Sequence, residues 1–232
     1  TYIRKQTLSN AERFVTPELK KYEDTIINSK AKIEDMEYYL FKEISGKIKE
    51  HKSLLIRLAE KLAYLDVMIS FATAAIENRY VRPEISNGFD MKIIEGRHPV
   101  VEKLIGRGDF VSNDTVLSEK EKFVVLTGPN MSGKSTYMKQ VALISIMAQI
   151  GSYVPAKEAK LSVVDKYLTR IGASDDILSG QSTFMVEMSE VSNIINNATE
   201  KSLIILDEVG RGTSTFDGVS IATAISEYLH EK

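Results

Sequence analysis

The chain has 232 residues, of which 43% are hydrophobic, so it can bury one large core or two smaller ones. It contains no cysteine, which excludes disulfide frameworks, thiolate metal sites and cysteine nucleophiles. Its formal charge of −2 gives no indication of a nucleic-acid partner. It does not exclude one either, because the net charge does not reveal a local basic patch on the folded surface.

The three histidines, His51, His98 and His230, are far apart and lack ligand spacing, so no structural metal is expected. The first residues are polar, and no run approaches the ~20 apolar residues of a membrane span. We therefore expect no membrane partner, and the absence of cysteine fits a reducing cytoplasm. The chain does not begin with methionine, which indicates a fragment of a longer protein.

Two long helices are predicted near the start of the chain. Thr16-Pro17-Glu18 is typical of a helix start, with a hydroxyl cap, a proline that needs no N–H, and an acid in the positive first turn. Apolar residues then recur at helical spacing from Ile26 to Ile48 and from Leu55 to Ile76, with a polar stretch between them. At ~1.5 Å per residue, each helix would reach some 40 Å. Periodicity leaves open whether they form a lever between modules or two ordinary packed helices.

Arg82-Pro83 ends this region, because the residue before a proline is pushed out of the helical conformation. The predicted strands beyond it are Met91–Ile94, Phe123–Thr127 and Leu203–Leu206. The predicted helices are Lys134–Ile150, Glu187–Ala198 and Asp217–Leu229. Strands that alternate with helices are typical of an α/β domain. We expect a helical segment over residues 1–84 and an α/β domain over residues 85–232.

A phosphate-binding loop is predicted between the second strand and the following helix. Gly128, Gly133, Lys134 and Ser135 have the G-x-x-x-x-G-K-[ST] spacing. The glycines let backbone N–H groups surround phosphate oxygens, Lys134 reaches the β and γ phosphates, and Ser135 is a ligand of Mg²⁺. The helix that follows adds its positive end. The bare pattern arises by accident in roughly one chain in a hundred, and the flanking strand and helix make a simple glycine turn a poor alternative.

The strand Leu203–Leu206 ends in two carboxylates, Asp207 and Glu208, which point to opposite sides of the pleat. Together with a phosphate loop, Asp207 is expected to hold Mg²⁺ through water. Glu208 is then expected to orient or deprotonate the attacking water, a role worth ~10²–10⁴-fold in rate. An apolar strand that ends in two acids is usually structural when it stands alone, but here it favours ATP hydrolysis.

Two further segments allow two interpretations each. The loop from Gly210 to Thr215 is either a plain connection or, with its arginine and hydroxyls near the acids, a subunit contact. Ser182 and Thr183 precede a helix, where hydroxyls act as caps or receive a γ-phosphate. Capping alone is the simpler interpretation when no further context is considered.

Three motifs in this order resemble the ATPase domain of the MutS family of DNA mismatch-repair proteins. They are GPNMSGKSTYMKQ at residues 128–140, STFMVEM at 182–188 and LDEVGRGTSTFDG at 206–218. The upstream segments YIRKQTL, LAYLDV and EGRHPVVE resemble the same family, so the resemblance covers essentially the whole chain. It implies a P-loop NTPase domain of the ATP-binding-cassette (ABC) type, preceded by long α-helices of a core and lever region.

The resemblance also implies a site that binds ATP or ADP with Mg²⁺ and is completed by a second copy of the protein. The residues that it implies in nucleotide binding are Phe110, which would stack on adenine, and Gly128, Pro129, Asn130, Met131, Ser132, Gly133, Lys134, Ser135 and Thr136. The implied catalytic residues are Glu208, Lys134, Asn130 near the γ-phosphate, and Ser182, which acts in the site of the other subunit. The implied metal ligands are Ser135 and Asp207.

The function implied is a Mg²⁺-dependent ATPase that drives conformational change in a bacterial, cytoplasmic and nucleoid-associated mismatch sensor. The implied partners are a second subunit, mismatched double-stranded DNA held by domains mostly absent from this chain, and downstream repair factors. No mismatch-reading module precedes Thr1, and the chain stops at Lys232, before the family's dimerisation helices. We therefore expect this fragment to pair poorly and to hydrolyse ATP slowly.

The main alternative is a nucleotide-gated DNA clamp or scaffold with little turnover, as in a recombination-associated relative. The intact pair of Asp207 and Glu208 favours hydrolysis instead. A chromosome-maintenance ATPase of the same superfamily and a paralogue with a nuclease tail are both disfavoured by STFMVEM.

Overall fold

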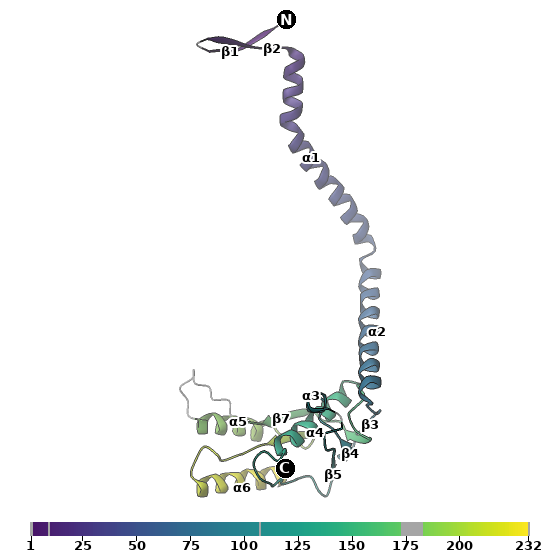
Figure 1. The fold of residues 1–232 in the computed structure, drawn as a ribbon, viewed down its shortest axis with the longest axis vertical. Coiled ribbons are helices and arrows are strands. Elements are labelled where there is room, and N and C mark those ends of the chain that lie inside the picture. Colours follow the sequence, from purple (N-terminus) through teal and green to yellow (C-terminus); the bar gives the residue numbers. More distant parts are fainter. Residues whose placement is uncertain (1, 9, 107, 173–182, 232) are drawn as a thin grey trace. The chain divides into compact units, whose positions relative to one another are not determined.

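A computed structural model describes residues 2–8, 10–106, 108–172 and 183–231 of the chain. The chain divides into two compact units, Thr1–Asp66 and Val67–Lys232 (Figure 1). The boundary falls inside the second long helix. Among the described residues, no helix is both long and apolar enough to cross a membrane.

The first unit begins with an antiparallel hairpin of β1 (Ile3–Leu8) and β2 (Ala11–Val15). Arg4 on β1 forms an ion pair with Glu12 on β2, with 2.7 Å between nitrogen and oxygen. This hairpin was not predicted from the sequence. Its strands alternate polar and apolar residues only loosely, and their described side chains are mostly exposed, so the usual core-facing pattern of a strand is weak.

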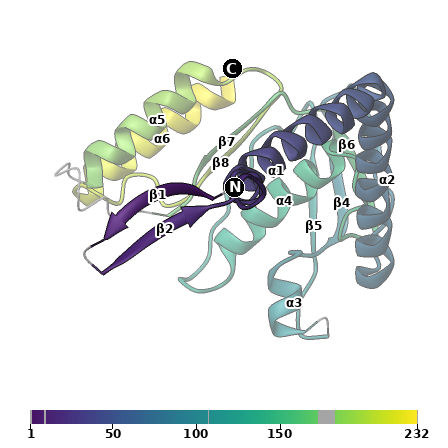
Figure 2. The ribbon, with the colours of Figure 1, turned by 90° about the horizontal axis from the view of Figure 1, so that it is seen from above.

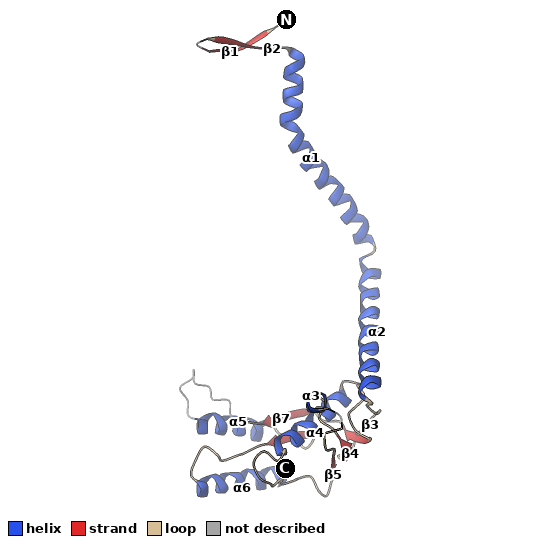
Figure 3. Ribbon diagram, viewed as in Figure 1, coloured by secondary structure: helices blue, strands red, loops and turns tan. Residues whose placement is uncertain are grey.

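Helix α1 (Pro17–Glu50) starts where the sequence predicts. The Thr16 hydroxyl accepts a hydrogen bond from the Leu19 N–H at 3.1 Å, so it caps the first turn. The helix has 34 residues and is about 50 Å long at ~1.5 Å per residue. Helix α2 (Lys52–Asn78) follows after a single break at His51 (Figure 3). Two long helices with a break in the polar stretch are therefore confirmed.

The second unit contains a four-stranded mixed sheet in the order β3-β6-β4-β5. The strands are β3 (Glu84–Ser86), β4 (Met91–Gly96), β5 (Asn113–Leu117) and β6 (Glu158–Ser162). β3 is parallel to β6, whereas β4 is antiparallel to both β6 and β5. Helix α4 (Lys134–Gln149) lies along this sheet (Figure 2). The fully buried Ile93, Ile144 and Leu161 join helix and sheet in one apolar core, which fixes the direction of α4.

A second, two-stranded sheet consists of β7 (Lys166–Arg170) and β8 (Ser202–Leu206), which are parallel. Between them in sequence lies α5 (Thr183–Asn197), which contacts β7. Parallel strands require such a crossover connection. Helix α6 (Thr215–Glu231) follows β8, so the carboxyl end of β8 leads into a loop between β8 and α6.

The remaining described helix is the short α3 (Val101–Ile105). The mixed α/β character and the three longer predicted helices of this unit are confirmed, although α5 and α6 begin a few residues earlier than predicted. The finer assignment to an ABC-type fold stays a prediction.

The predicted strand Phe123–Thr127 is wrong. This segment forms no ladder with any other described strand, and the Val124 and Val125 side chains are 55% and 73% exposed. An apolar run becomes a strand only when a neighbouring strand takes up its N–H and C=O groups. Such pairing is not encoded in the run itself. The other apolar strand of this half of the chain, β8, is paired with β7.

The carboxyl end of α2 is bound to the sheet by Arg97. Its guanidinium donates hydrogen bonds to the carbonyl oxygens of Asn78 and Arg79 at 3.3 and 3.4 Å. It also pairs with the buried carboxylate of Glu102 on α3 at 2.9 Å. Carbonyl groups at a helix end lack partners within the helix. Arg97 therefore satisfies the end of α2 and joins it to the loop after β4.

The buried imidazole of His98 makes stability depend on pH. Its Nδ1 accepts the N–H groups of Val100 and Val101 at 3.3 Å each, which requires an unprotonated nitrogen. Burial lowers the pKa of His98 from its usual 6.5, and the positive charge of Lys139 acts in the same direction. A histidine whose pKa is lower in the folded state than in the unfolded state contributes its full stabilising effect at pH values above the unfolded-state pKa. That stability is lost as the pH falls through the folded-state pKa.

We therefore predict that the free energy of unfolding falls more steeply below about pH 6.5 in the parent than in a His98→Asn variant. The asparagine oxygen can accept the same N–H groups but does not titrate. Denaturant unfolding of both proteins across this range tests the prediction, and parallel curves would contradict it.

Candidate active site

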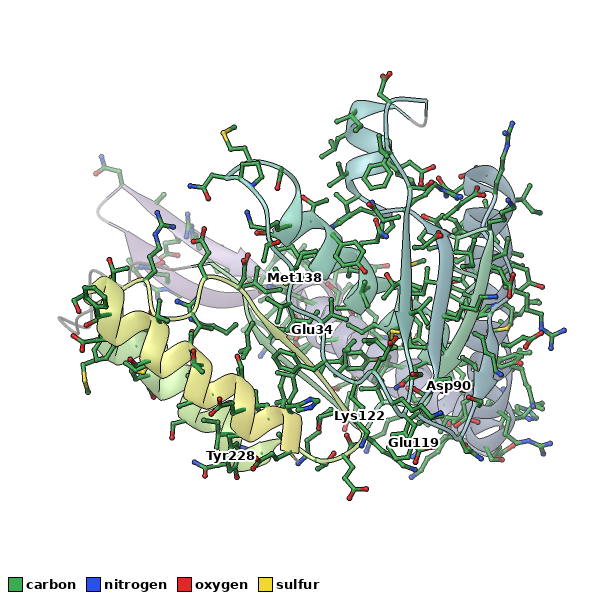
Figure 4. The ribbon with its side chains drawn as sticks, turned by 90° about the horizontal axis from the view of Figure 1, so that it is seen from below. Glu34, Asp90, Glu119, Lys122, Met138 and Tyr228 are labelled. Atoms are coloured by element: carbon green, nitrogen blue, oxygen red, sulfur yellow. The ribbon has the colours of Figure 1, made fainter. Side chains whose placement is uncertain are left out.

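The loop of residues 128–133 has a backbone conformation that its glycines permit. Gly128 and Gly133 have φ values of +151° and +91°, and Met131 also has a positive φ of +64°. Gly133 is the N-cap of α4 and offers no side-chain cap. The first N–H groups of the helix are therefore available to another acceptor, as phosphate sites require. The loop precedes α4, whose second turn is marked by Met138 in Figure 4.

The Lys134 ammonium lies against this same loop. Its Nζ donates hydrogen bonds to the carbonyl oxygens of Gly128 and Pro129 at 2.8 and 2.7 Å. The positive charge of the side chain is therefore held at the loop rather than directed away from it. Phosphate oxygens are stronger acceptors for an ammonium group than neutral carbonyls are.

Ser135 and Asp207, the two residues predicted to hold the metal, are in direct contact. The Ser135 hydroxyl donates a hydrogen bond to Oδ2 of Asp207. Asp207 is only 7% exposed, and its N–H donates to the Arg170 carbonyl on β7 at 2.8 Å. The core of α4 fixes Ser135, and the β7–β8 ladder fixes Asp207. The structure thus brings a hydroxyl and a carboxylate, both hard oxygen ligands, to one place at the loop.

Glu208 differs from Asp207 in both backbone and environment. Its φ is +54°, a conformation that costs a non-glycine residue ~1–3 kcal/mol and is concentrated at functional sites. Its carboxylate is 47% exposed and forms an ion pair with Arg211 at 2.5 Å. The two acids therefore have different surroundings. β8 ends at Leu206, before both of them, so their placement on opposite sides of a pleat stays a prediction, and the left-handed backbone of Glu208 was not predicted.

For the other predicted site residues, the structure gives their position in the fold and their exposure. Asn130, Met131 and Ser132 are exposed in the loop, and Thr136 is half-buried in the first turn of α4. Phe110 is half-buried in the segment between α3 and β5, so its stacking on adenine stays a prediction. Ser182 lies outside the described residues.

A contact that the sequence did not predict joins α5 to the loop after β8. The carboxylate of Glu187 is 2% exposed, and its Oε1 accepts the Gly210 N–H at 2.5 Å. The sequence feature that could have indicated this contact is the position of Glu187 on its helix. Glu187 precedes Val191 by four residues and Ile194 by seven, and both are buried, so a charged residue occupies the core face of the helix.

The two ends of the chain match family models described as MutS family domain IV, over residues 1–32, and MutS domain V, over residues 124–232. Proteins named DNA mismatch repair protein MutS match nearly all of the chain. The one from Fusobacterium nucleatum subsp. nucleatum is 60% identical over 229 residues, or 99% of the chain. Those from Caldicellulosiruptor bescii and Ruminiclostridium cellulolyticum are 61% and 59% identical over all 232 residues.

The chain belongs to the MutS family. It spans about a quarter of the length of these relatives, 26% of the first and 27% of the other two. The domain V match contains the whole loop of residues 128–133, as well as Ser135, Asp207 and Glu208. The residues that the structure brings together thus lie in a single MutS domain.

Proposed function

We propose that the chain is the part of a MutS mismatch-repair protein that binds and hydrolyses ATP with Mg²⁺, and that hydrolysis changes the conformation of the DNA-bound protein. The observation that supports this most strongly is the contact between Ser135 and Asp207 at the loop. A phosphate loop alone fits many nucleotide-binding proteins. A loop serine in contact with a buried carboxylate at the end of a strand is the arrangement that a Mg²⁺-nucleotide site requires.

In this proposal the loop and the start of α4 bind the phosphates. The free N–H groups of the first helical turn donate to phosphate oxygens, and the helix end favours negative charge. Lys134 exchanges the carbonyls of Gly128 and Pro129 for the β and γ phosphates. Asn130 lies near the γ-phosphate, and Phe110 stacks on adenine. The loop residues Pro129, Met131, Ser132, Gly133 and Thr136 shape the remainder of the phosphate site.

Ser135 and Asp207 would hold Mg²⁺, Asp207 through water. The ion, when bound, would supply positive charge that offsets the negative charge of the phosphate oxygens. Asp207 is suited to this role because β7 and β8 fix its backbone and burial fixes its side chain. The same pair of residues contributes the oxygen chemistry that Mg²⁺ prefers.

Glu208 orients or deprotonates the attacking water. In the described structure its carboxylate is paired with Arg211, whose side chain is 76% exposed. An exposed pair of this kind contributes only about 0–1 kcal/mol. The pair therefore opens at little cost, which leaves Glu208 available as the catalytic base.

A second copy of the protein completes the site by placing its Ser182 near the γ-phosphate. Hydrolysis then depends on pairing of the two ATPase domains, and α1 and α2 carry the change towards the DNA-binding parts. Mismatched DNA and downstream repair factors are the partners of the whole protein in this account, and the bacterial cytoplasm, at the nucleoid, is its location.

The second candidate is a nucleotide-gated DNA clamp that binds ATP with little turnover. One observation favours it: the carboxylate needed for hydrolysis is engaged by Arg211. The two candidates differ in whether phosphate is released at a rate that depends on pairing.

Phosphate release measured against protein concentration separates them. We expect the rate per molecule to rise with concentration in the parent and to remain low in Ser182→Ala, with nucleotide affinity unchanged. Ser189→Ala, which removes an exposed serine of α5, is the matched control and is expected to behave like the parent. Absence of release at every concentration would contradict the enzymatic proposal and favour the clamp.

A further inference from the structure

Glu187 is a buried carboxylate at a position where packing alone would favour an apolar side chain. It lies on the face of α5 that carries the buried Val191 and Ile194, and it is 2% exposed. Burying a carboxylate is unfavourable unless hydrogen bonds replace the lost water. Here the Gly210 N–H supplies one, at 2.5 Å. The side chain is thus bound to a backbone group in the loop after β8.

The loop that receives this bond is confined on both sides. Gly210 has a φ of +87°, and a Cβ at this position would lie 2.6 Å from the Gly218 carbonyl oxygen on α6. A Cβ on Gly212 would lie 3.1 Å from Cα of Phe184 on α5. The loop therefore lies close to the backbone of α6 at Gly210 and to that of α5 at Gly212, and a Cβ at either position would force a neighbouring atom to shift. Its path is set by close backbone approach and by the bond to Glu187.

Glu208 lies two residues before Gly210, at the start of the same loop. It has a positive φ of +54°, a conformation that persists only when the surrounding structure enforces it. On one side of Glu208, the Asp207 N–H is bound to the Arg170 carbonyl. On the other side, the nearest fixed backbone group is the N–H of Gly210, held by Glu187. The two bonds therefore hold the backbone on both sides of Glu208.

We propose that Glu187 is a positioning residue for ATP hydrolysis: by accepting the Gly210 N–H, it fixes the loop from which Glu208 reaches the attacking water. This inference rests on the proposed function. Glu187 touches neither the phosphate loop nor the pair of Ser135 and Asp207 in the described contacts. Its loss therefore lowers turnover while nucleotide binding stays unchanged.

The test compares Glu187→Met with Glu187→Gln. Methionine keeps the length of the side chain but cannot replace the carboxylate oxygen, whereas glutamine keeps an oxygen acceptor. We expect turnover in Glu187→Met to fall by about tenfold or more, because misplacement of a catalytic group by about 1 Å costs up to about 10²-fold. The affinity for Mg²⁺-ATP is expected to stay within about twofold, and Glu187→Gln is expected to stay close to the parent. Glu200→Gln, an exposed acid beyond the end of α5, is the control.

Hydrogen exchange of the Gly210 amide, without nucleotide, provides a readout that is independent of hydrolysis. Fast exchange in Glu187→Met and slow exchange in the parent and in Glu187→Gln would support the bond and its replacement. Parental turnover in Glu187→Met, equal loss in both variants, or loss of nucleotide binding in Glu187→Met would each overturn the inference. A parent that releases no phosphate, yet shows this exchange pattern, would overturn the proposed function and the catalytic role of the bond, but not the bond itself.

Discussion

Replacement of Glu208 by alanine is expected to lower ATP turnover by about 10²–10⁴-fold, the usual contribution of a positioned general base. Nucleotide binding is expected to persist, because the phosphate loop lies elsewhere in the chain and the contact between Ser135 and Asp207 does not involve the Glu208 side chain. Release of the ion pair with Arg211 changes stability little, since both side chains are exposed. Single-turnover phosphate release and equilibrium binding of ATP measure the two effects separately.

Glu200→Ala is the matched control for this variant, because it removes an exposed carboxylate away from the loop. If Glu208→Ala hydrolysed ATP at the parental rate, the catalytic base would be another residue. Loss of binding together with turnover would mean that Glu208 supports the nucleotide site rather than the chemical step.

Replacement of Lys134 by alanine is expected to weaken Mg²⁺-ATP binding by roughly 10- to 100-fold. A hydrogen bond to a charged group contributes about 1.5–3 kcal/mol, and each 1.4 kcal/mol is tenfold in affinity. The ammonium is already held at the loop by the carbonyls of Gly128 and Pro129, so little ordering accompanies its transfer to phosphate. Titration of the nucleotide into the parent and the variant gives both affinities.

Lys139→Ala is the control for the loss of a positive charge from α4, since Lys139 is exposed beyond the first turn. It is expected to keep the parental affinity. If Lys134→Ala bound the nucleotide as tightly as the parent does, the assignment of the phosphate loop would be wrong.

The helices were predictable because their signals are local. Thr16 and Pro17 mark the start of α1, and apolar residues recur through both long helices, so caps and periodicity suffice. The segment Phe123–Thr127 shows the limit of this reasoning. It has the composition of a strand, but strand formation requires a neighbour whose identity the segment does not contain.

The candidate site was predictable to a similar extent. The spacing of the glycines, Lys134 and Ser135 is a local pattern, and the meeting of Ser135 with Asp207 follows from the combination of a phosphate loop with an acidic strand end. The bond from Gly210 to Glu187 joins residues 23 apart in sequence. The sequence indicates this bond only through a carboxylate on an apolar helix face, and that position does not identify Gly210 as the partner.

Phosphate release from ATP by the parent chain, with Mg²⁺ and with excess chelator, tests the central claim most directly. The account predicts release that requires Mg²⁺, is lowered by about 10²–10⁴-fold in Glu208→Ala, and needs more ATP in Lys134→Ala because that variant binds the nucleotide more weakly. Absence of release, or release that is unaffected by the chelator and both substitutions, would contradict it.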